Sequence, residues 1–202
     1  MNTDPVSQTI FVTALPAEAK PVRRHFRLER DNRFRERPVY RRANLMLVIS
    51  GTGRQAAWDT VRWCRTSGLA AAEDIWINLG IGGHQTHNLG QAVLADEVVE
   101  SSTGKRWICN ASHTPLWVTG RVVTLAAPEF DYRNGAVYDM EAAGFLEAVE
   151  QYGSLRHAYC LKVVSDNAIH GIDEINGQRV SRLLGDTLPA LEHLLQRAES
   201  QR

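Results

Sequence analysis

The chain has 202 residues with 23 basic and 23 acidic side chains, so its zero net charge gives no general attraction to nucleic acid or an anionic membrane. Its 44% hydrophobic and 23% charged residues are close to globular averages and exclude a disordered or fibrous chain. No apolar stretch approaches the roughly 18–20 residues of a membrane-spanning helix. The N-terminus is too polar for a signal peptide. We therefore expect a soluble, cytoplasmic protein.

The cysteines and the distribution of charge add two further points. Cys64, Cys109 and Cys160 are odd in number and far apart, which suggests neither a disulfide framework nor a zinc site. Residues 1–42 hold ten basic and five acidic side chains, and nine arginines lie between Arg23 and Arg42. A basic arm for RNA or phosphate is one interpretation. We favour a solvated helix face followed by an edge hairpin, where charge discourages aggregation of strands.

The first third of the chain alternates apolar runs with amphipathic stretches. Thr9–Leu15 predicts a strand, and Pro16 suits the first turn of a helix that would carry Val22 and Phe26 inward. A hairpin around residues 43–44 then pairs Pro38–Arg42 with Leu45–Ser50, whose apolar composition suits the centre of a sheet.

The remaining elements continue the alternation. The expected helices and strands are the helices Arg54–Thr66, Met140–Tyr152 and Glu174–Arg197 and the strands Ile75–Leu79, Ala92–Val99, Trp117–Leu125, Val137–Asp139 and His157–Ser165. A glycine loop at residues 80–83 closes the strand at 75–79. Alternating strands and helices without a Pro- or Ser-rich break predict one α/β domain, residues 1–202, with a largely parallel or mixed sheet.

Two familiar motifs are incomplete. Gly51-x-Gly53-x-x-Ala56 follows a strand and opens a helix, but no acidic residue ends the next strand, so a dinucleotide site is disfavoured. A glycine turn near a small ligand remains open. His84 and His87 have no third ligand at useful spacing, and we expect a solvent-exposed pair and no metal site. The sequence has neither a phosphate-binding P-loop nor a nucleophile elbow.

Three carboxylates follow predicted strands: Glu18, Glu141 and Asp166. Ligand sites in open α/β sheets form beyond the carboxyl ends of the strands. Each residue alone could be a surface charge or a helix cap, and Glu141 also suits a helix dipole. Their presence at one edge of one sheet favours a functional site.

Five segments, in order along the chain, resemble the nucleoside phosphorylase and nucleosidase superfamily, most nearly the 5′-methylthioadenosine/S-adenosylhomocysteine nucleosidases. These segments are Ala14–Ala19, Ser50–Ala57, Asn78–Gly83, Val137–Ala143 and Val163–Ala168. The resemblance implies a single-domain, three-layer α/β fold with a central mixed sheet flanked by helices. It also implies cleavage of the N-glycosidic bond of a nucleoside.

The resemblance implies a role for each carboxylate. Asp166 would protonate or hydrogen-bond N7 of a purine, Glu141 would accept hydrogen bonds from the ribose hydroxyls, and Glu18 would activate water. Met140 would pack against the sugar. The remaining residues implied at the substrate pocket are Thr52, Gly80, Ile81, Gly82 and Ser165.

The attacking group can be water or phosphate. Asn78 and Ile81 stand where phosphorylases of the superfamily have an arginine and a hydroxyl residue, and the early Glu18 is typical of the hydrolases, so we favour hydrolysis. Arg54, the arginine-rich stretch or a partner subunit could still serve phosphate as co-substrate. A phosphorylase, including one of the hopanoid-pathway type, and a non-catalytic nucleoside-binding protein stay as alternatives. No cofactor is expected.

The sequence departs from the superfamily between Gly90 and Met140. This stretch is shorter than usual, and Val123–Pro128 stands where the base-recognition loop would be. The base is therefore undecided. The expected partners are a small-molecule nucleoside and further copies of the chain, as a dimer or hexamer, and the polar stretch His170–Asn176 is expected to be a flap over Asp166.

Overall fold

The computed structural model describes residues 8–111, 117–128, 132–133 and 135–200, so the prediction about an N-terminal signal falls largely outside the described residues. The strands are β1 (Thr9–Thr13), β2 (Glu29–Arg30), β3 (Val39–Arg42), β4 (Leu45–Ile49), β5 (Ile75–His84), β6 (Ala92–Glu100), β7 (Arg106–Ile108), β8 (Val118–Thr124), β9 (Val137–Asp139) and β10 (Ala158–Asp166). The helices are α1 (Pro16–His25), α2 (Arg54–Thr66), α3 (Ala142–Tyr152) and α4 (Gly177–Ser200), with 3₁₀ turns at Leu155–His157 and Ile172–Glu174.

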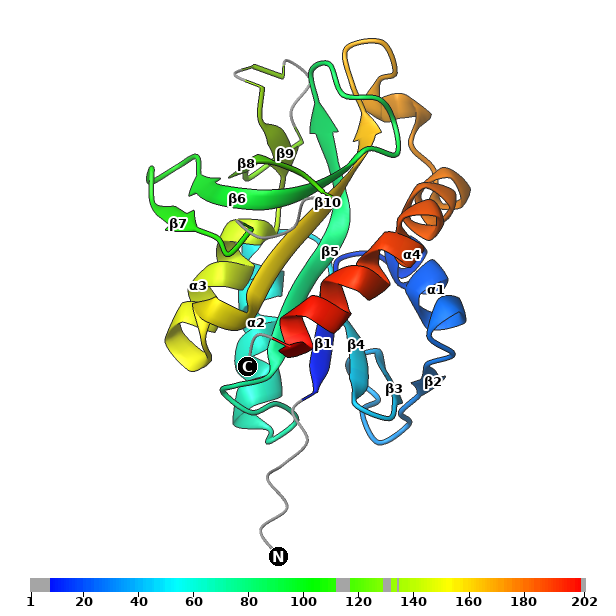
Figure 1. The fold of residues 1–202 in the computed structure, drawn as a ribbon, viewed down its shortest axis with the longest axis vertical. Helices are drawn as coiled ribbons and strands as arrows, with labels where there is room; N and C mark the ends of the chain where they lie inside the picture. Colours follow the sequence, from blue (N-terminus) through cyan, green and yellow to red (C-terminus); the bar gives the residue numbers. More distant parts are fainter. Residues whose placement is uncertain (1–7, 112–116, 129–131, 134, 201–202) are drawn as a thin grey trace, which may run out of the picture.

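The strands form one mixed sheet with two parts. An open arm runs β5-β1-β4-β3-β2, in which β1 is parallel to both β4 and β5. The other part closes on itself, because β5 pairs with β10, β10 with β6, β6 with β8, β8 with β9, and β9 again with β5. The central strand β5 therefore belongs to both parts (Figure 1).

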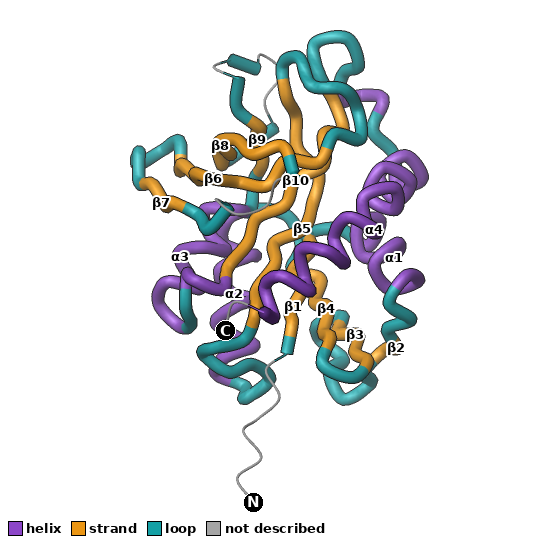
Figure 2. Tube along the Cα trace, viewed as in Figure 1, coloured by secondary structure: helices purple, strands orange, loops and turns teal. Residues whose placement is uncertain are grey.

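The helices lie on both sides of this sheet. Helices α2 and α3 pack together on one side, and α1 and α4 lie side by side on the other (Figure 2). Successive residues of a strand point to opposite faces, so Val12 joins the core under α2 and α3 while Phe11 joins the core under α1 and α4. Trp76 and Phe145 are fully buried in the first core. The predicted three-layer α/β fold with a central mixed sheet is confirmed.

Several predicted boundaries are wrong. The glycine segment 80–83 is not a loop, because β5 continues through it and pairs with β10 along its whole length. Glycines look like a strand end in sequence, but pairing with a neighbour on each side keeps them extended here. Helix α3 begins at Ala142, with Glu141 as its N-cap, and α4 begins at Gly177 after the turn at 172–174. Strands β2 and β7 were not predicted.

The arginine-rich stretch runs from the end of α1 through β2 and β3, and β2 is the outermost strand of the open arm. The predicted edge hairpin is therefore confirmed. Two of its arginines lie over aromatic rings, Arg23 over Tyr40 at 3.9 Å and Arg37 over Trp63 at 5.6 Å from the ring centroid. Among the described residues, no helix is both long and apolar enough to cross a membrane.

Candidate active site

A pocket of about 330 Å³ opens where β1, β5, β9 and β10 end. Eight of the residues predicted for the site line it: Glu18, Thr52, Ile81, Gly82, Met140, Glu141, Ser165 and Asp166. Residues that were not predicted complete the lining: Ala14, Leu15, Gly83, Leu125, Ala127, Pro128, Tyr132, Tyr138, Asp139, Ile172 and Ile175. Gly80, also predicted, lies behind Glu18 instead. Ile172 and Ile175 belong to the expected flap, which the structure thus brings to the pocket.

Glu18 lies in the first turn of α1 and is only 2% exposed. One carboxylate oxygen accepts hydrogen bonds from the backbone N–H groups of Ala14 and Leu15, both at 2.8 Å, and the other accepts from Ile81 N–H at 3.0 Å. A Cβ atom on Gly80 would lie 3.0 Å from Glu18 Oε1, so glycine makes room for the carboxylate. Burial raises the pKa of Glu18, and these backbone N–H groups oppose that shift.

Behind Glu18 lies Lys162, a fully buried lysine on β10. Its ammonium forms an ion pair with Asp139 at 2.7 Å. Burial lowers the pKa of Lys162, but the charges of Asp139 and Glu141 raise it by more, so the amine stays protonated. Asp139 also accepts hydrogen bonds from the Thr124 hydroxyl at 2.7 Å and from Ala142 N–H at 2.8 Å. This arrangement places one buried cation among three acidic residues.

Glu141 is 7% exposed and connects two distant parts of the chain. Its Oε1 accepts a hydrogen bond of 2.7 Å from the backbone N–H of Gly53, at the start of α2. Burial raises the pKa of Glu141 to about 7, and the Lys162 charge opposes this while Asp139 adds to it. Glu141 is therefore poised to change protonation near neutral pH.

Asp166 stands at the opposite end of the pocket, at the end of β10. The hydroxyl of Ser165 donates to Oδ1 and the hydroxyl of Tyr132 donates to Oδ2. Burial raises the pKa of Asp166 to about 6, against a smaller opposing effect from Arg179. A carboxyl group with this pKa can hold or release a proton close to neutral pH.

Comparison with known proteins follows the fold and not the sequence. No protein-family model matches the chain, and no curated protein matches it. The S-adenosylhomocysteine nucleosidase of Streptococcus pyogenes, solved with 5-methylthiotubericidin, aligns with a TM-score of 0.71 at 18% identity over 92% of this chain and 98% of its own. The 5′-methylthioadenosine nucleosidase of Arabidopsis thaliana gives 0.73 at 19% identity, over 97% and 96%. A futalosine hydrolase mutant of Helicobacter pylori gives 0.73 at 10%, over 95% and 100%.

The chain has the nucleosidase fold. The resemblance that the five sequence segments predict is confirmed at this level, and the match extends over nearly the full length of each of these proteins. The roles assigned to individual residues stay predictions.

Three residues of the nucleosidase-fold pocket were missed from the sequence: Lys162, Asp139 and Tyr132. Lys162 left a signal, because it is the one charged residue inside an otherwise apolar strand, and an unpaired lysine is almost never buried. Asp139 was assigned to a strand and given no role. Tyr132 lies in the stretch that departs from the superfamily, and no motif marks it.

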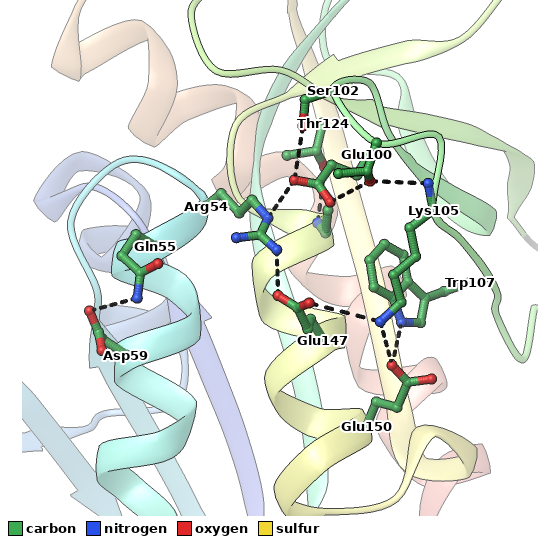
Figure 3. A network of polar contacts seen from close by, with 12 residues as sticks. Arg54, Gln55, Asp59, Glu100, Ser102, Lys105, Trp107, Thr124, Glu147 and Glu150 are labelled. Carbon is green, nitrogen blue, oxygen red and sulfur yellow. Dashed lines mark hydrogen bonds and ion pairs between the residues drawn. The ribbon is translucent and has the colours of Figure 1, made fainter.

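Arg54, a candidate for holding phosphate, does not line the pocket. Its guanidinium forms ion pairs with Glu100, at 2.7 Å, and with Glu147 on α3 (Figure 3). The same network continues through Lys105, which pairs with Glu150 at 2.9 Å. Arg54 therefore ties the start of α2 to α3 and β6.

The predicted solvent-exposed histidine pair is wrong for His84, which is only 3% exposed. The two rings stack with centroids 3.7 Å apart. His84 Nδ1 accepts hydrogen bonds from the backbone N–H groups of Thr86 at 3.1 Å and His87 at 2.9 Å. Burial lowers the pKa of His84, which keeps the ring neutral and able to accept both bonds. The pair shapes the loop after β5.

Proposed function

We propose that this protein hydrolyses the N-glycosidic bond of a nucleoside. The observation that carries the proposal is the charge of the pocket: four acidic residues line it, and no basic side chain does so among the residues that the structure describes. The acidic residues are Glu18, Asp139, Glu141 and Asp166. Neighbours of the same fold were crystallised with nucleoside analogues, which supports a nucleoside as the ligand.

The two ends of the pocket match the charges that develop as a C1′–N bond breaks. The sugar becomes positive in the transition state, and the carboxylates of Glu18 and Glu141 would stabilise that charge. The leaving base becomes negative and needs a proton. Asp166, whose pKa is raised to about 6, is suited to deliver it. Both interactions are stronger in the transition state than in the bound substrate, which is the condition for catalysis.

Glu18 is the proposed base for the attacking water. Three backbone N–H groups fix its carboxylate, and each oxygen keeps a lone pair for a further partner. The buried ammonium of Lys162 lowers the pKa of Glu18 and so favours its ionised form. General-base assistance of this kind is worth roughly 10²–10⁴-fold in rate.

Water suits this pocket better than phosphate does. A phosphate dianion among four acidic residues would be repelled, by about 4 kcal/mol for each ionised group 4 Å away at a dielectric constant of about 20. Arg54, the sequence candidate for phosphate, is paired with Glu100 and Glu147 outside the pocket. Hydrolysis is therefore the proposed reaction, with neither phosphate nor another cofactor required.

The test is a panel of purine and pyrimidine nucleosides, including 5′-methylthioadenosine, incubated with the protein with and without phosphate. We expect free base and free sugar in both buffers at equal rates. Base released only with phosphate, together with a sugar 1-phosphate, would establish a phosphorylase. Thermal stabilisation by a nucleoside without turnover would establish a binding protein. Size-exclusion chromatography with light scattering tests the predicted homo-oligomer on the same sample.

A further inference from the structure

Tyr132 occupies the reactive end of the pocket. It comes from the short stretch before β9 and is nevertheless only 7% exposed. Its hydroxyl donates to Asp166 Oδ2, and Ser165 donates to Oδ1, so both oxygens of the proposed acid already have a hydroxyl partner. A base that takes a proton from Asp166 must bind to one of these oxygens.

The ring of Tyr132 also has a prepared place. It lies against Gly83 on β5, and a Cβ atom on that residue would overlap the ring. On the other side Tyr138 follows with its ring centroid at 5.7 Å. Both tyrosines line the pocket. The backbone of β5 and the two rings therefore form an aromatic wall beside Asp166.

This wall lies where the sequence lacks the base-recognition loop of the superfamily. We propose that Tyr132 is the base-subsite residue of this protein: its hydroxyl holds the position on Asp166 that the nucleobase takes, and its ring packs against the bound base. The inference rests on the proposed function for the identity of the ligand. The ligand class is a heteroaromatic base with a hydrogen-bond acceptor next to the glycosidic nitrogen.

The two parts of the side chain then have opposite effects on binding. The base must displace the hydroxyl from Asp166, so the hydroxyl competes with it. The ring adds stacking area, so it favours the base. A merely structural tyrosine would show no such opposition, since loss of the hydroxyl and loss of the ring would both weaken the site or leave it unchanged.

The experiment measures calorimetric binding of free adenine, hypoxanthine and uracil to the full chain. Tyr132→Phe is expected to lower the Kd of the bound base roughly two- to tenfold, the value of one net hydrogen bond. Tyr132→Ala is expected to raise it roughly tenfold or more, the value of a lost base–aromatic stack. Tyr152→Phe is the matched control: Tyr152 ends α3, its ring packs on Trp58, and it does not line the pocket.

A second variant tests the wall without changing the tyrosine. Gly83→Ala places a methyl group where the ring lies and should weaken base binding as Tyr132→Ala does. Thermal melts establish that each variant is folded, and Gly83→Ala decides the question if Tyr132→Ala is not. A hydroxyl on the carboxylate favours its ionised form. In Tyr132→Phe the loss of adenine affinity at rising pH should therefore move to higher pH.

Weaker or unchanged binding in Tyr132→Phe, unchanged binding in both wall variants, or no binding of any of the three bases would overturn the inference. Because the assay uses free bases, it does not depend on turnover. Opposite effects of the two Tyr132 variants in a protein that cleaves no nucleoside would retain the base subsite and reject the proposed hydrolysis.

Discussion

The two ends of the pocket hold their acidic groups in different ways. At the proposed sugar end, Glu18, Asp139 and Glu141 are fixed by backbone N–H groups and surround the buried ammonium of Lys162. At the proposed base end, Asp166 is held by two hydroxyl side chains that can rotate. One end is therefore built to keep a fixed negative charge, and the other to exchange hydrogen-bond partners and a proton.

The charge balance explains why the fixed end also responds to pH. Three carboxylates share one ammonium, so two negative charges remain uncompensated in a buried space. Protonation of Glu141, with its pKa raised to about 7, relieves part of that repulsion. The proposed reaction needs Glu141 ionised and Asp166 protonated, which is the reverse of the order in which their pKa values would fill them.

The largest effect is expected at the base end. Asp166→Asn keeps the shape of the side chain but cannot supply the proton, so base release at pH 6.5 should fall at least 10²–10⁴-fold. The folded structure should be unaffected, as measured by circular dichroism and thermal melting. Asp173→Asn, on the exposed turn at 172–174, is the control. Near-normal turnover in Asp166→Asn would remove the proton-exchanging end from the comparison.

The fixed end should show its importance in stability. Lys162→Met removes the cation and leaves buried carboxylates without a partner, which typically costs 3–5 kcal/mol. The free energy of unfolding in urea at pH 8 measures the loss, and part of it should return at pH 5, where the carboxyl groups can protonate. Lys105→Met, which breaks a partly exposed pair with Glu150, should cost less than about 1 kcal/mol. Equal losses in both variants would contradict the buried charge balance.

The pH dependence of stability tests the same cluster in the wild-type chain. The pKa of Glu141 is raised to about 7 and that of Asp166 to about 6, so the folded state binds more protons than the unfolded state above pH 4. The free energy of unfolding should therefore fall as the pH rises from about 4 to about 7, by on the order of 2 kcal/mol, and then level off. Glu141→Gln should flatten the slope; a slope that survives in that variant would place its origin elsewhere.

The smallest effect is expected outside the pocket, in the network of Figure 3. Arg54→Gln leaves Glu100, which is 7% exposed, with only hydroxyl partners, and should cost about 1–2 kcal/mol in the free energy of unfolding. Gly53, the next residue, donates to Glu141, so the KM for a nucleoside should rise a few-fold. Turnover should stay independent of phosphate. Arg62→Gln, an exposed arginine on the same helix, should change neither quantity.

Much of the fold could be predicted from the sequence, because β-rich runs such as Thr9–Leu15 alternate with amphipathic stretches such as Arg54–Thr66. The three carboxylates could be predicted to meet, since each follows a strand of one sheet. The extension of β5 through its glycines could not, because it depends on pairing with β10 and β9, which are distant in sequence.

The missed parts of the site have the same physical origin. Lys162 needs Asp139 and Glu141 to be stable in the core, and those partners are more than twenty residues away. Tyr132 reaches Asp166 only because Gly83 leaves room for its ring. Such dependences belong to tertiary contacts, and neither hydrophobic periodicity nor a local motif carries them.

The closed part of the sheet has a consequence for how the protein folds. Its ring is completed by β9, three residues long, which joins Gly83 on β5 to Val123 on β8 through Tyr138. That closure links segments more than fifty residues apart, and such contacts form late because the chain entropy must be lost first. Asp139, Met140 and Glu141 sit on or directly after this strand. We therefore expect the amide protons of β9 to exchange with deuterium sooner than those of β1 and β5, with the pocket opening while the core stays folded.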